Sequence, residues 1–448
     1  MKRIVFIFTV FLFQTSYSQQ IAKIGTGVIP ITPVHTFAWN DSIILRGNFS
    51  TLPDNTPSDG LAYWDGFHWK DLSLNTYSDG RVYLVYEDKL LMGGLLSFRS
   101  NVANLPLLQL NGNSWNNVYG VTSSNSLGSI NDMIIYKNEL YVAGQLQRIG
   151  GKYVKNIAKW DGVTWTDVGG GCGGSVNEIN SLAILNNELY VGGFFDIAGT
   201  KVAKNVAKWD GTSWFALDSG VHQGAVSKIV AFKNKLIVMG GFTQAGSITH
   251  LSKQYKGRAI WDGANWIRMT GFAELAYEYA IQEYRGELFM GTYMNSRNHT
   301  INDTVMMSWD GTNYTNRLGA DAEIIDISVV NDRLIITGDF NNLLTTSVSK
   351  MASYLLDPVG VANTKVNLPL FNIYPNPTTS QLNISNLSNY KNIRISIRNS
   401  LSSEVKEMNV DFTNNDCTFS MEGLPFGVYF IQFFDRDTLI DTQKFVVL

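Results

Sequence analysis

The sequence predicts an all-β protein, consisting of a seven-bladed β-propeller followed by a small C-terminal β-sandwich. Three observations support this prediction. A hairpin of the type Trp-Asp-Gly recurs six times, an apolar strand recurs seven times, and a run of short strands follows near the C-terminus. Four-stranded units of about 40 to 50 residues are typical of propeller blades. Six or eight blades are the alternatives to seven.

The hairpin has nearly the same form in each copy. Aspartate or asparagine followed by glycine supplies the positive φ of a tight turn, and the flanking residues lie on two paired strands. Successive glycines are 46, 50, 49, 52 and 48 residues apart, and ten of the eleven tryptophans lie in these hairpins. The copies are Trp64–Trp69, Leu110–Trp115, Trp160–Trp165, Trp209–Trp214, Trp261–Trp266 and Trp309–Tyr314. Each Trp pair is expected to pack in the core between blades.

A recurring apolar strand precedes each hairpin. A further apolar strand lies about ten residues earlier, as at Ile130–Ile135, which gives four strands per unit. The seventh unit ends near Leu355 without a fourth strand, whereas Ile21–Gly27 resembles a fourth strand. The N-terminal strand is therefore expected to complete the last blade and close the ring, which removes an exposed edge. The seven recurring strands are Ile43–Gly47, Leu90–Gly94, Leu140–Gly144, Leu189–Gly193, Leu236–Gly240, Leu288–Thr292 and Leu334–Gly338.

The amino-acid sequences of these units resemble those of a known group of propellers. Leu189–Phe194 and Asn205–Gly211 are similar to repeats of kelch and galactose-oxidase-like propellers, in particular those of bacterial surface proteins. The resemblance covers residues 19–357 and implies a fold. It implies no activity, because propellers host many unrelated functions.

Residues 1–18 predict a signal peptide. Lys2 and Arg3 precede the apolar run Ile4–Phe13, and small residues end at Ser18. This run is too short to cross a bilayer, which needs roughly 20 residues. Cleavage is expected after Ser18. No other stretch approaches spanning length, so no transmembrane anchor is predicted.

The C-terminal part begins after a linker at residues 358–368, and residues 369–448 predict a small β-sandwich. The expected strands are Gln381–Ile384, Ile393–Ile397, Thr418–Met421, Val428–Phe433 and Lys444–Leu448. Three spaced motifs resemble the type A C-terminal sorting domain of the type IX secretion system. The residues that carry these motifs are Tyr374, Pro375, Asn376, Pro377, Gly427, Tyr429 and Lys444. The stretch Asn399–Ser403 departs from the family, which commonly has a glycine in this turn.

This resemblance implies a route and a partner. The chain would pass through the periplasm, and the type IX machinery would carry it across the outer membrane. The sorting domain would then be removed, and the protein would be released or attached to the outer cell surface of an outer-membrane bacterium.

Charge and cysteine content exclude several classes of function. The formal net charge of −3 becomes −5 when Lys2 and Arg3 leave with the signal peptide, and no basic run exists to bind nucleic acid. Cys172 and Cys417 lie in different predicted domains, so they form neither a disulfide framework nor a metal motif. The five histidines share no spacing, which argues against a copper-radical oxidase. No metal or cofactor is predicted.

The sixth unit breaks the repeat pattern. At five and at ten residues before the recurring strand, it alone carries a carboxylate, at Glu283 and Glu278 respectively. The first strand of a blade lines the central channel of a propeller, so we expect a binding patch of Glu278, Tyr279, Glu283 and Arg285. A separation of five places the two glutamates on opposite faces of a regular strand, which argues against a paired-carboxylate mechanism.

These observations favour a non-catalytic protein that binds or adheres to a glycan or another protein, with loops of the blades providing specificity. The alternative is a secreted polysaccharide hydrolase or lyase that uses the atypical sixth blade.

Overall fold

The computed structural model describes most of the 448-residue chain. The described part contains strands and no helix, which confirms the all-β prediction. The chain divides into two compact units, one of them Tyr17–Asp357 and the other containing Pro358–Leu448. The described residues are 17–23, 33–39, 42–47, 49–52, 55–64, 68–72, 76–98, 101–112, 114–174, 177–249, 257–269, 276–294, 304–344, 346–348, 350–358, 371–374, 378, 380–386, 391–399, 404–411, 416–421, 423–425, 427–436 and 438–447. The predicted signal peptide up to Ser16 and the linker beyond Pro358 lie outside them.

Seven sheets follow one another along the unit Tyr17–Asp357, each with at least four antiparallel strands in its described part. The first sheet contains β2 (Pro33–Trp39), β3 (Ser42–Gly47), β4 (Leu61–Trp64) and β5 (Trp69–Asp71). The second contains β6 (Thr76–Tyr86), β7 (Lys89–Phe98), β8 (Asn101–Asn111) and β9 (Ser114–Asn116). The third contains β10 (Leu127–Tyr136), β11 (Glu139–Ile149), β13 (Ile157–Trp160) and β14 (Trp165–Asp167), with β12 (Lys152–Tyr153) paired to β11. The fourth and fifth are β16 (Glu178–Leu185), β17 (Glu188–Phe194), β20 (Val206–Trp209) and β21 (Trp214–Ala216); and β23 (Val226–Phe232), β24 (Lys235–Gly240), β26 (Gly257–Trp261) and β27 (Trp266–Arg268).

The last two sheets also contain strands from more distant parts of the unit. The sixth is β28 (Ala276–Tyr284), β29 (Glu287–Met294), β30 (Thr304–Trp309) and β31 (Tyr314–Ala320), extended by β34 (Asn342–Leu343) and β35 (Thr346–Ser347). The seventh has the order β1 (Tyr17–Lys23), β36 (Met351–Pro358), β33 (Arg333–Gly338) and β32 (Ile324–Val330). The N-terminal strand thus joins the last sheet with residues 17–23, and residues 24–27 of the expected strand Ile21–Gly27 lie outside the described residues. Two small sheets lie between the larger ones: β15 (Cys172–Gly173), β18 (Ile197–Ala198) and β19 (Lys201–Val202), and β22 (Val221–His222) with β25 (Gln244–Ala245).

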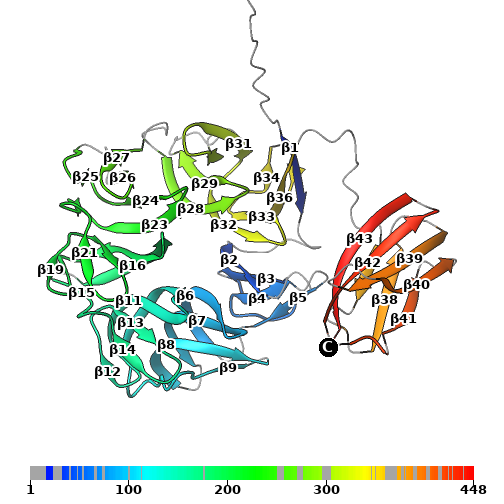
Figure 1. Ribbon diagram of the computed structural model, residues 1–448, viewed down its shortest axis with the longest axis horizontal. Coiled ribbons are helices and arrows are strands. Elements are labelled where there is room, and N and C mark those ends of the chain that lie inside the picture. Colours follow the sequence, from blue (N-terminus) through cyan, green and yellow to red (C-terminus); the bar gives the residue numbers. More distant parts are fainter. Residues whose placement is uncertain are drawn as a thin grey trace, which may run out of the picture. The chain divides into compact units, whose positions relative to one another are not determined.

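Each of the seven sheets shares a buried apolar cluster with the next one. One cluster joins Leu107 of the second sheet to Ile130 and Val142 of the third, and equivalent clusters join the later pairs. The seventh and first sheets share a cluster too, in which Ile335 meets Ile43. First strands such as β2 and β32 face the middle of the unit, whereas β9 and β31 lie at its rim (Figure 1).

The second aromatic residue of a hairpin links its sheet to the preceding one. The indole Nε1 of Trp214 donates to the carbonyl oxygen of Val168 at 2.9 Å, and the Trp214 ring lies 5.1 Å from that of Trp209. Trp115, Trp165 and Trp266 donate in the same way to Leu72, Tyr119 and Leu217. The expectation that the Trp pairs pack between neighbouring units is confirmed for Trp160–Trp165, Trp209–Trp214 and Trp261–Trp266, because both tryptophans of each pair lie in a buried cluster shared with the preceding sheet.

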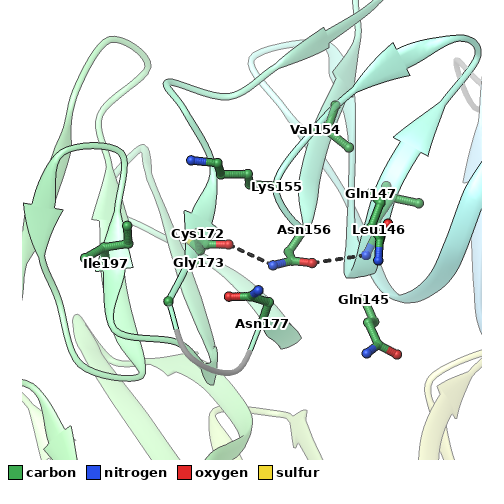
Figure 2. A pocket seen from close by; sticks show the side chains of 11 residues that line it. Gln145, Leu146, Gln147, Val154, Lys155, Asn156, Cys172, Gly173, Asn177 and Ile197 are labelled. Carbon is green, nitrogen blue, oxygen red and sulfur yellow. Dashed lines mark hydrogen bonds between the residues drawn. The ribbon is translucent and has the colours of Figure 1, made fainter.

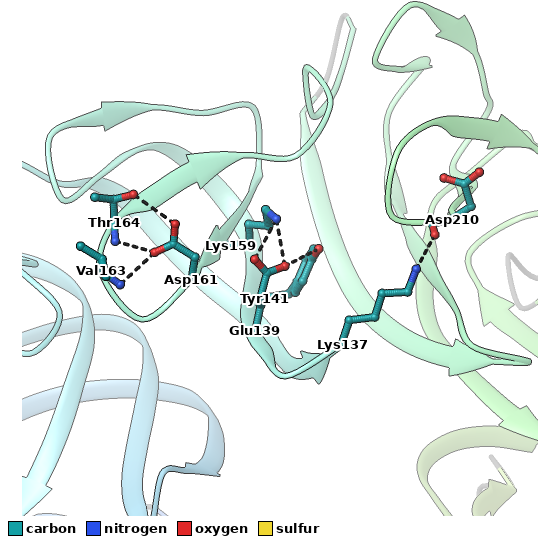
Figure 3. Close-up of polar contacts among 8 residues, drawn as sticks. All are labelled: Lys137, Glu139, Tyr141, Lys159, Asp161, Val163, Thr164 and Asp210. Atoms are coloured by element: carbon teal, nitrogen blue, oxygen red, sulfur yellow. Dashed lines mark hydrogen bonds and ion pairs between the residues drawn. The ribbon is translucent and has the colours of Figure 1, made fainter.

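The hairpin turns are held by their aspartates (Figure 3). Asp161 accepts hydrogen bonds from the backbone N–H groups of Val163 and Thr164 at 2.8 and 2.7 Å, which lowers the pKa of its carboxyl. The following Gly162 has a φ of +99°, as predicted for this turn. Lys137, in the turn between β10 and β11, donates to the carbonyl oxygen of Asp210 in the fourth sheet. The turns therefore also connect neighbouring sheets.

The C-terminal unit contains two sheets that enclose one apolar core. They are β37 (Phe371–Tyr374), β38 (Gln381–Asn386) and β41 (Asp416–Ser420), and β40 (Glu404–Asp411), β39 (Asn392–Asn399), β42 (Gly427–Asp435) and β43 (Thr438–Val447). Phe371 and Phe433 stack across the core with ring centroids 4.1 Å apart. The sequence missed β37 and β40. β40 is an edge strand with alternating charged residues, a composition that protects an edge from pairing but carries little apolar signal.

Candidate functional site

A cavity of about 620 Å³ lies where the loops of the third and fourth sheets meet. Its wall comes from the end of β11, the segment before β13, the sheet of β15 and β18, and the start of the fourth sheet. Ligand pockets in proteins have volumes of about this size. The lining residues are Gln145, Leu146, Gln147, Val154, Lys155, Asn156, Cys172, Gly173, Gly174, Asn177 and Ile197.

Asn156 fixes the floor of the cavity (Figure 2). Its backbone has a φ of +67°, a conformation that asparagine tolerates better than most residues. Its side chain accepts a hydrogen bond from Leu146 N at 3.2 Å and donates to the carbonyl oxygen of Cys172 at 2.8 Å. One buried amide therefore holds together three segments of the wall.

Four long polar side chains surround this floor. Gln145, Gln147, Lys155 and Asn177 are exposed, while Leu146 and Cys172 beneath them are fully buried. Each amide offers both a donor and an acceptor, and the lysine offers donors and a positive charge. The rim can thus hydrogen-bond a ligand that carries several hydroxyl groups.

The lining residues supply no acid, base or activated nucleophile. None of the eleven is Asp, Glu or His. Burial raises the pKa of the Cys172 thiol far above its usual value, so the reactive thiolate does not form. The part of the chain that the structure describes holds no cluster of three metal-ligating side chains and no helix suited to span a membrane.

The first strand of every large sheet contains a β-bulge at the same place. In β10 the pairing with β11 skips Asn131, and in β16 the pairing with β17 skips Asn180. Equivalent bulges occur in the other five first strands. The bulged side chains reach across to the next sheet, since Asn131 donates to Ile179 O at 3.0 Å and Asn180 to Val226 O at 2.9 Å. Asn131 and Asn180 therefore connect neighbouring sheets through their side chains.

The bulge corrects one inference about the sixth sheet. Glu278 pairs with Thr292 and Glu283 with Leu288, with a register shift between Glu278 and Ala280. Because Leu288 and Thr292 are four residues apart in β29, the two glutamates occupy register positions of the same face, not of opposite faces. A separation of five residues would place the two glutamates on opposite faces of a regular strand. The extra residue of the bulge reverses this alternation between the faces.

The predicted patch of the sixth sheet is only partly described. Glu283 is exposed at the end of β28, and the side chains of Glu278 and Tyr279 lie outside the described residues. Arg285 forms an ion pair with Asp332 and donates to the carbonyl oxygen of Leu356, both in the seventh sheet or its turn. Arg285 thus connects two sheets, and the binding role of the four residues stays a prediction.

The motif residues of the C-terminal unit lie at strand ends. Tyr374 ends β37, and Pro375, Asn376 and Pro377 lie outside the described residues. Gly427 opens β42, and the hydroxyl of the buried Tyr429 donates to Pro425 O at 2.7 Å, which fixes the loop before that strand.

Lys444 pairs with Phe430 in the backbone register of β42 and β43, and its side chain lies outside the described residues.

Residues 372–448 match the family described as the secretion system C-terminal sorting domain. These residues are a type IX sorting domain. Such a domain directs export across the outer membrane, to the cell surface or the medium. The sorting domain confirms the C-terminal resemblance, whereas the kelch-type identity of the repeats stays a prediction.

Known structures share low similarity with the whole chain. PorZ, a surface component of the type IX secretion system of Porphyromonas gingivalis, is 12% identical with a TM-score of 0.39, over 93% of this chain and 66% of PorZ. The extracellular domain of the two-component system protein BT4673 of B. thetaiotaomicron is 12% identical with a TM-score of 0.47, over 95% of this chain and 54% of that one. YCF48 bound to D1 peptide is 11% identical with a TM-score of 0.40, over 77% and 97%. The chain thus spans less than two thirds of the first two structures. No curated protein matches the sequence.

The sequence pattern did not reveal the cavity, because the wall combines segments of two units that are separated in the sequence. The repeat itself held a signal: Gln147 and Asp196 occupy the same place in units 49 residues apart, and only one of them carries a charge.

Proposed function

We propose that the protein is exported through its sorting domain and acts outside the cell as a non-catalytic glycan-binding protein. The observation that carries this proposal is the cavity rimmed by Gln145, Gln147, Lys155 and Asn177, which offers several neutral donors and acceptors but no carboxylate or imidazole. Vicinal sugar hydroxyls pair well with such amides, since each hydroxyl and each amide both donates and accepts.

A peptide ligand fits this wall less well. Peptides that bind as an added strand need free backbone groups at a sheet edge. Here the backbone around the cavity is already paired: Cys172 N donates to Lys155 O at 2.9 Å, and Asp196 N donates to Gly173 O at 2.8 Å. The side chains of the rim are left as the groups that recognise a ligand.

The remaining parts of the proposal concern the scaffold. We propose a closed seven-bladed propeller at residues 19–357, a signal peptide at 1–18 and a linker at 358–368. Support for closure comes from β1 in the seventh sheet and from the apolar cluster shared by the seventh and first sheets. Cleavage after Ser18 would leave Gln19–Lys23 of β1 to pair in that sheet.

Glycan binding can be tested by affinity electrophoresis of the purified protein in gels that contain dextran, laminarin, xylan, mannan, polygalacturonate or chondroitin sulfate. We expect at least one polymer to retard the protein. Replacing both Gln145 and Asn177 by alanine should weaken binding about tenfold, because two hydrogen bonds of about 0.5–1.5 kcal/mol each are lost. The matched control is Glu283→Ala, in the sixth sheet, which should bind normally.

Two outcomes would contradict this proposal. One is that no polymer retards the protein. The other is that Glu283→Ala abolishes binding while the Gln145/Asn177 variant binds normally, which would move the site to the sixth sheet. Release of shorter products from a retarding polymer would favour the catalytic alternative.

A further inference from the structure

The hairpin beside the cavity occurs twice, in the third and fourth sheets, with the same backbone. Residues 145–156 and 194–205 align without a gap at an offset of 49. In the third sheet Val154 N donates to Gln147 O at 3.0 Å, and in the fourth Ala203 N donates to Asp196 O at 3.0 Å. Gln147 and Asp196 are therefore structurally equivalent, and so are the two lysines that follow them, Lys155 and Lys204.

The two hairpins differ in charge. In the fourth sheet, Lys204 Nζ lies 2.6 Å from a carboxylate oxygen of Asp196, so the two charges compensate each other. In the third sheet the partner position is Gln147, which is neutral. Among the described residues, no carboxylate lies within 4.0 Å of Lys155 Nζ. The lysine at the cavity thus has no ion-pair partner among the described residues, and the Asp196 side chain, which is paired with Lys204, lies against Gly174 of the same cavity.

Two further lysines lie on the same two hairpins. Lys152 and Lys201 are exposed in β12 and β19, at equivalent positions of the two hairpins, and neither forms an ion pair with a described residue. The protein as a whole has a formal net charge of −3. A lysine without an ion-pair partner attracts an anionic ligand more strongly than the neutral amides beside it do.

We propose that the cavity selects a glycan with an anionic oxygen group, a carboxylate or a sulfate, which pairs with Lys155 Nζ. The amides of Gln145, Gln147 and Asn177 bind the neighbouring hydroxyls. This inference rests on the proposed glycan-binding function and specifies the class of glycan.

The test measures binding of the purified protein to a galacturonate hexasaccharide, to its fully methyl-esterified form and to a sulfated galactan oligosaccharide, by titration calorimetry at low salt. We expect at least one anionic probe to bind about fivefold more tightly than the neutral ester, as one exposed ion pair allows, and we expect added salt to remove the difference. A preference for the galacturonate identifies a carboxylate, and a preference for the galactan identifies a sulfate.

Three variants test whether the preference depends on the positive charge of Lys155. Gln147→Asp recreates the ion pair of the fourth sheet, so it should abolish the preference for an anionic probe over the neutral ester. Lys155→Gln should do the same. Lys204→Gln, the matched control, removes a lysine that is already paired and should retain the preference.

The inference is overturned if the neutral ester binds as tightly as both anionic probes, or if Gln147→Asp and Lys155→Gln keep the preference; the glycan-binding function then stands. If no probe and no polymer binds, the glycan-binding function fails, and this inference fails with it. Binding of a peptide in place of any glycan overturns both.

Discussion

Trp214→Ala should destabilise the unit Tyr17–Asp357 by about 3–5 kcal/mol, the range observed when a buried tryptophan is truncated. Trp214 is 3% exposed, packs against Trp209 and donates to Val168 O of the preceding sheet. The substitution therefore opens a cavity and breaks a hydrogen bond between two sheets. Urea unfolding, followed by tryptophan fluorescence and by circular dichroism, would measure the effect.

Two further variants separate the causes. Trp214→Phe keeps most of the apolar ring and removes only the indole hydrogen bond, while Val168 O still accepts from Gly171 N at 2.9 Å, so a loss of about 0.5–1.5 kcal/mol is expected. Phe215→Ala changes the next residue of the same strand, which is 44% exposed beneath Lys208, and should cost under about 1 kcal/mol. Equal stability of Trp214→Phe and the wild type would show that the hydrogen bond between sheets contributes nothing.

Removal of residues 372–448 should abolish export across the outer membrane. The sorting domain is the part of the chain that carries the signal for type IX secretion, and the other unit has apolar clusters of its own. We expect the truncated protein to be found inside the cell envelope. Immunoblots of medium, surface-exposed and periplasmic fractions would measure its distribution.

The control for this truncation is Tyr429→Phe. It removes only the hydrogen bond to Pro425 O, at a cost of about 1 kcal/mol, so the domain should still fold and export should continue. Normal amounts of the truncated protein in the medium would contradict the role assigned to the sorting domain.

Local patterns of the sequence predicted the elements that depend on local physics. The Asp-Gly turns followed from the positive φ that glycine permits, and the structure adds the side-chain hydrogen bonds of Asp161. Residues compared at the same spacing in different units are also equivalent in the structure, since Glu283 pairs with Leu288 as Ile135 pairs with Leu140.

Features that depend on two segments at once were not predictable in this way. The bulge in β28 requires a comparison with β29, and without it the two glutamates were placed on opposite faces. The cavity requires the third and fourth sheets together. The sequence shows Gln147 at the place that Asp196 occupies in the next unit. The effect of this difference on the charge of the lysine follows only from the contact between Asp196 and Lys204.

Hydrogen exchange of the purified protein, with and without the glycan that it binds, tests the central claim most directly. We expect the ligand to slow exchange at the amides around the cavity, in segments 145–147, 154–156 and 172–174, and to leave segment 280–285 of the sixth sheet unchanged. Slower exchange at 280–285, with no change around the cavity, would contradict it.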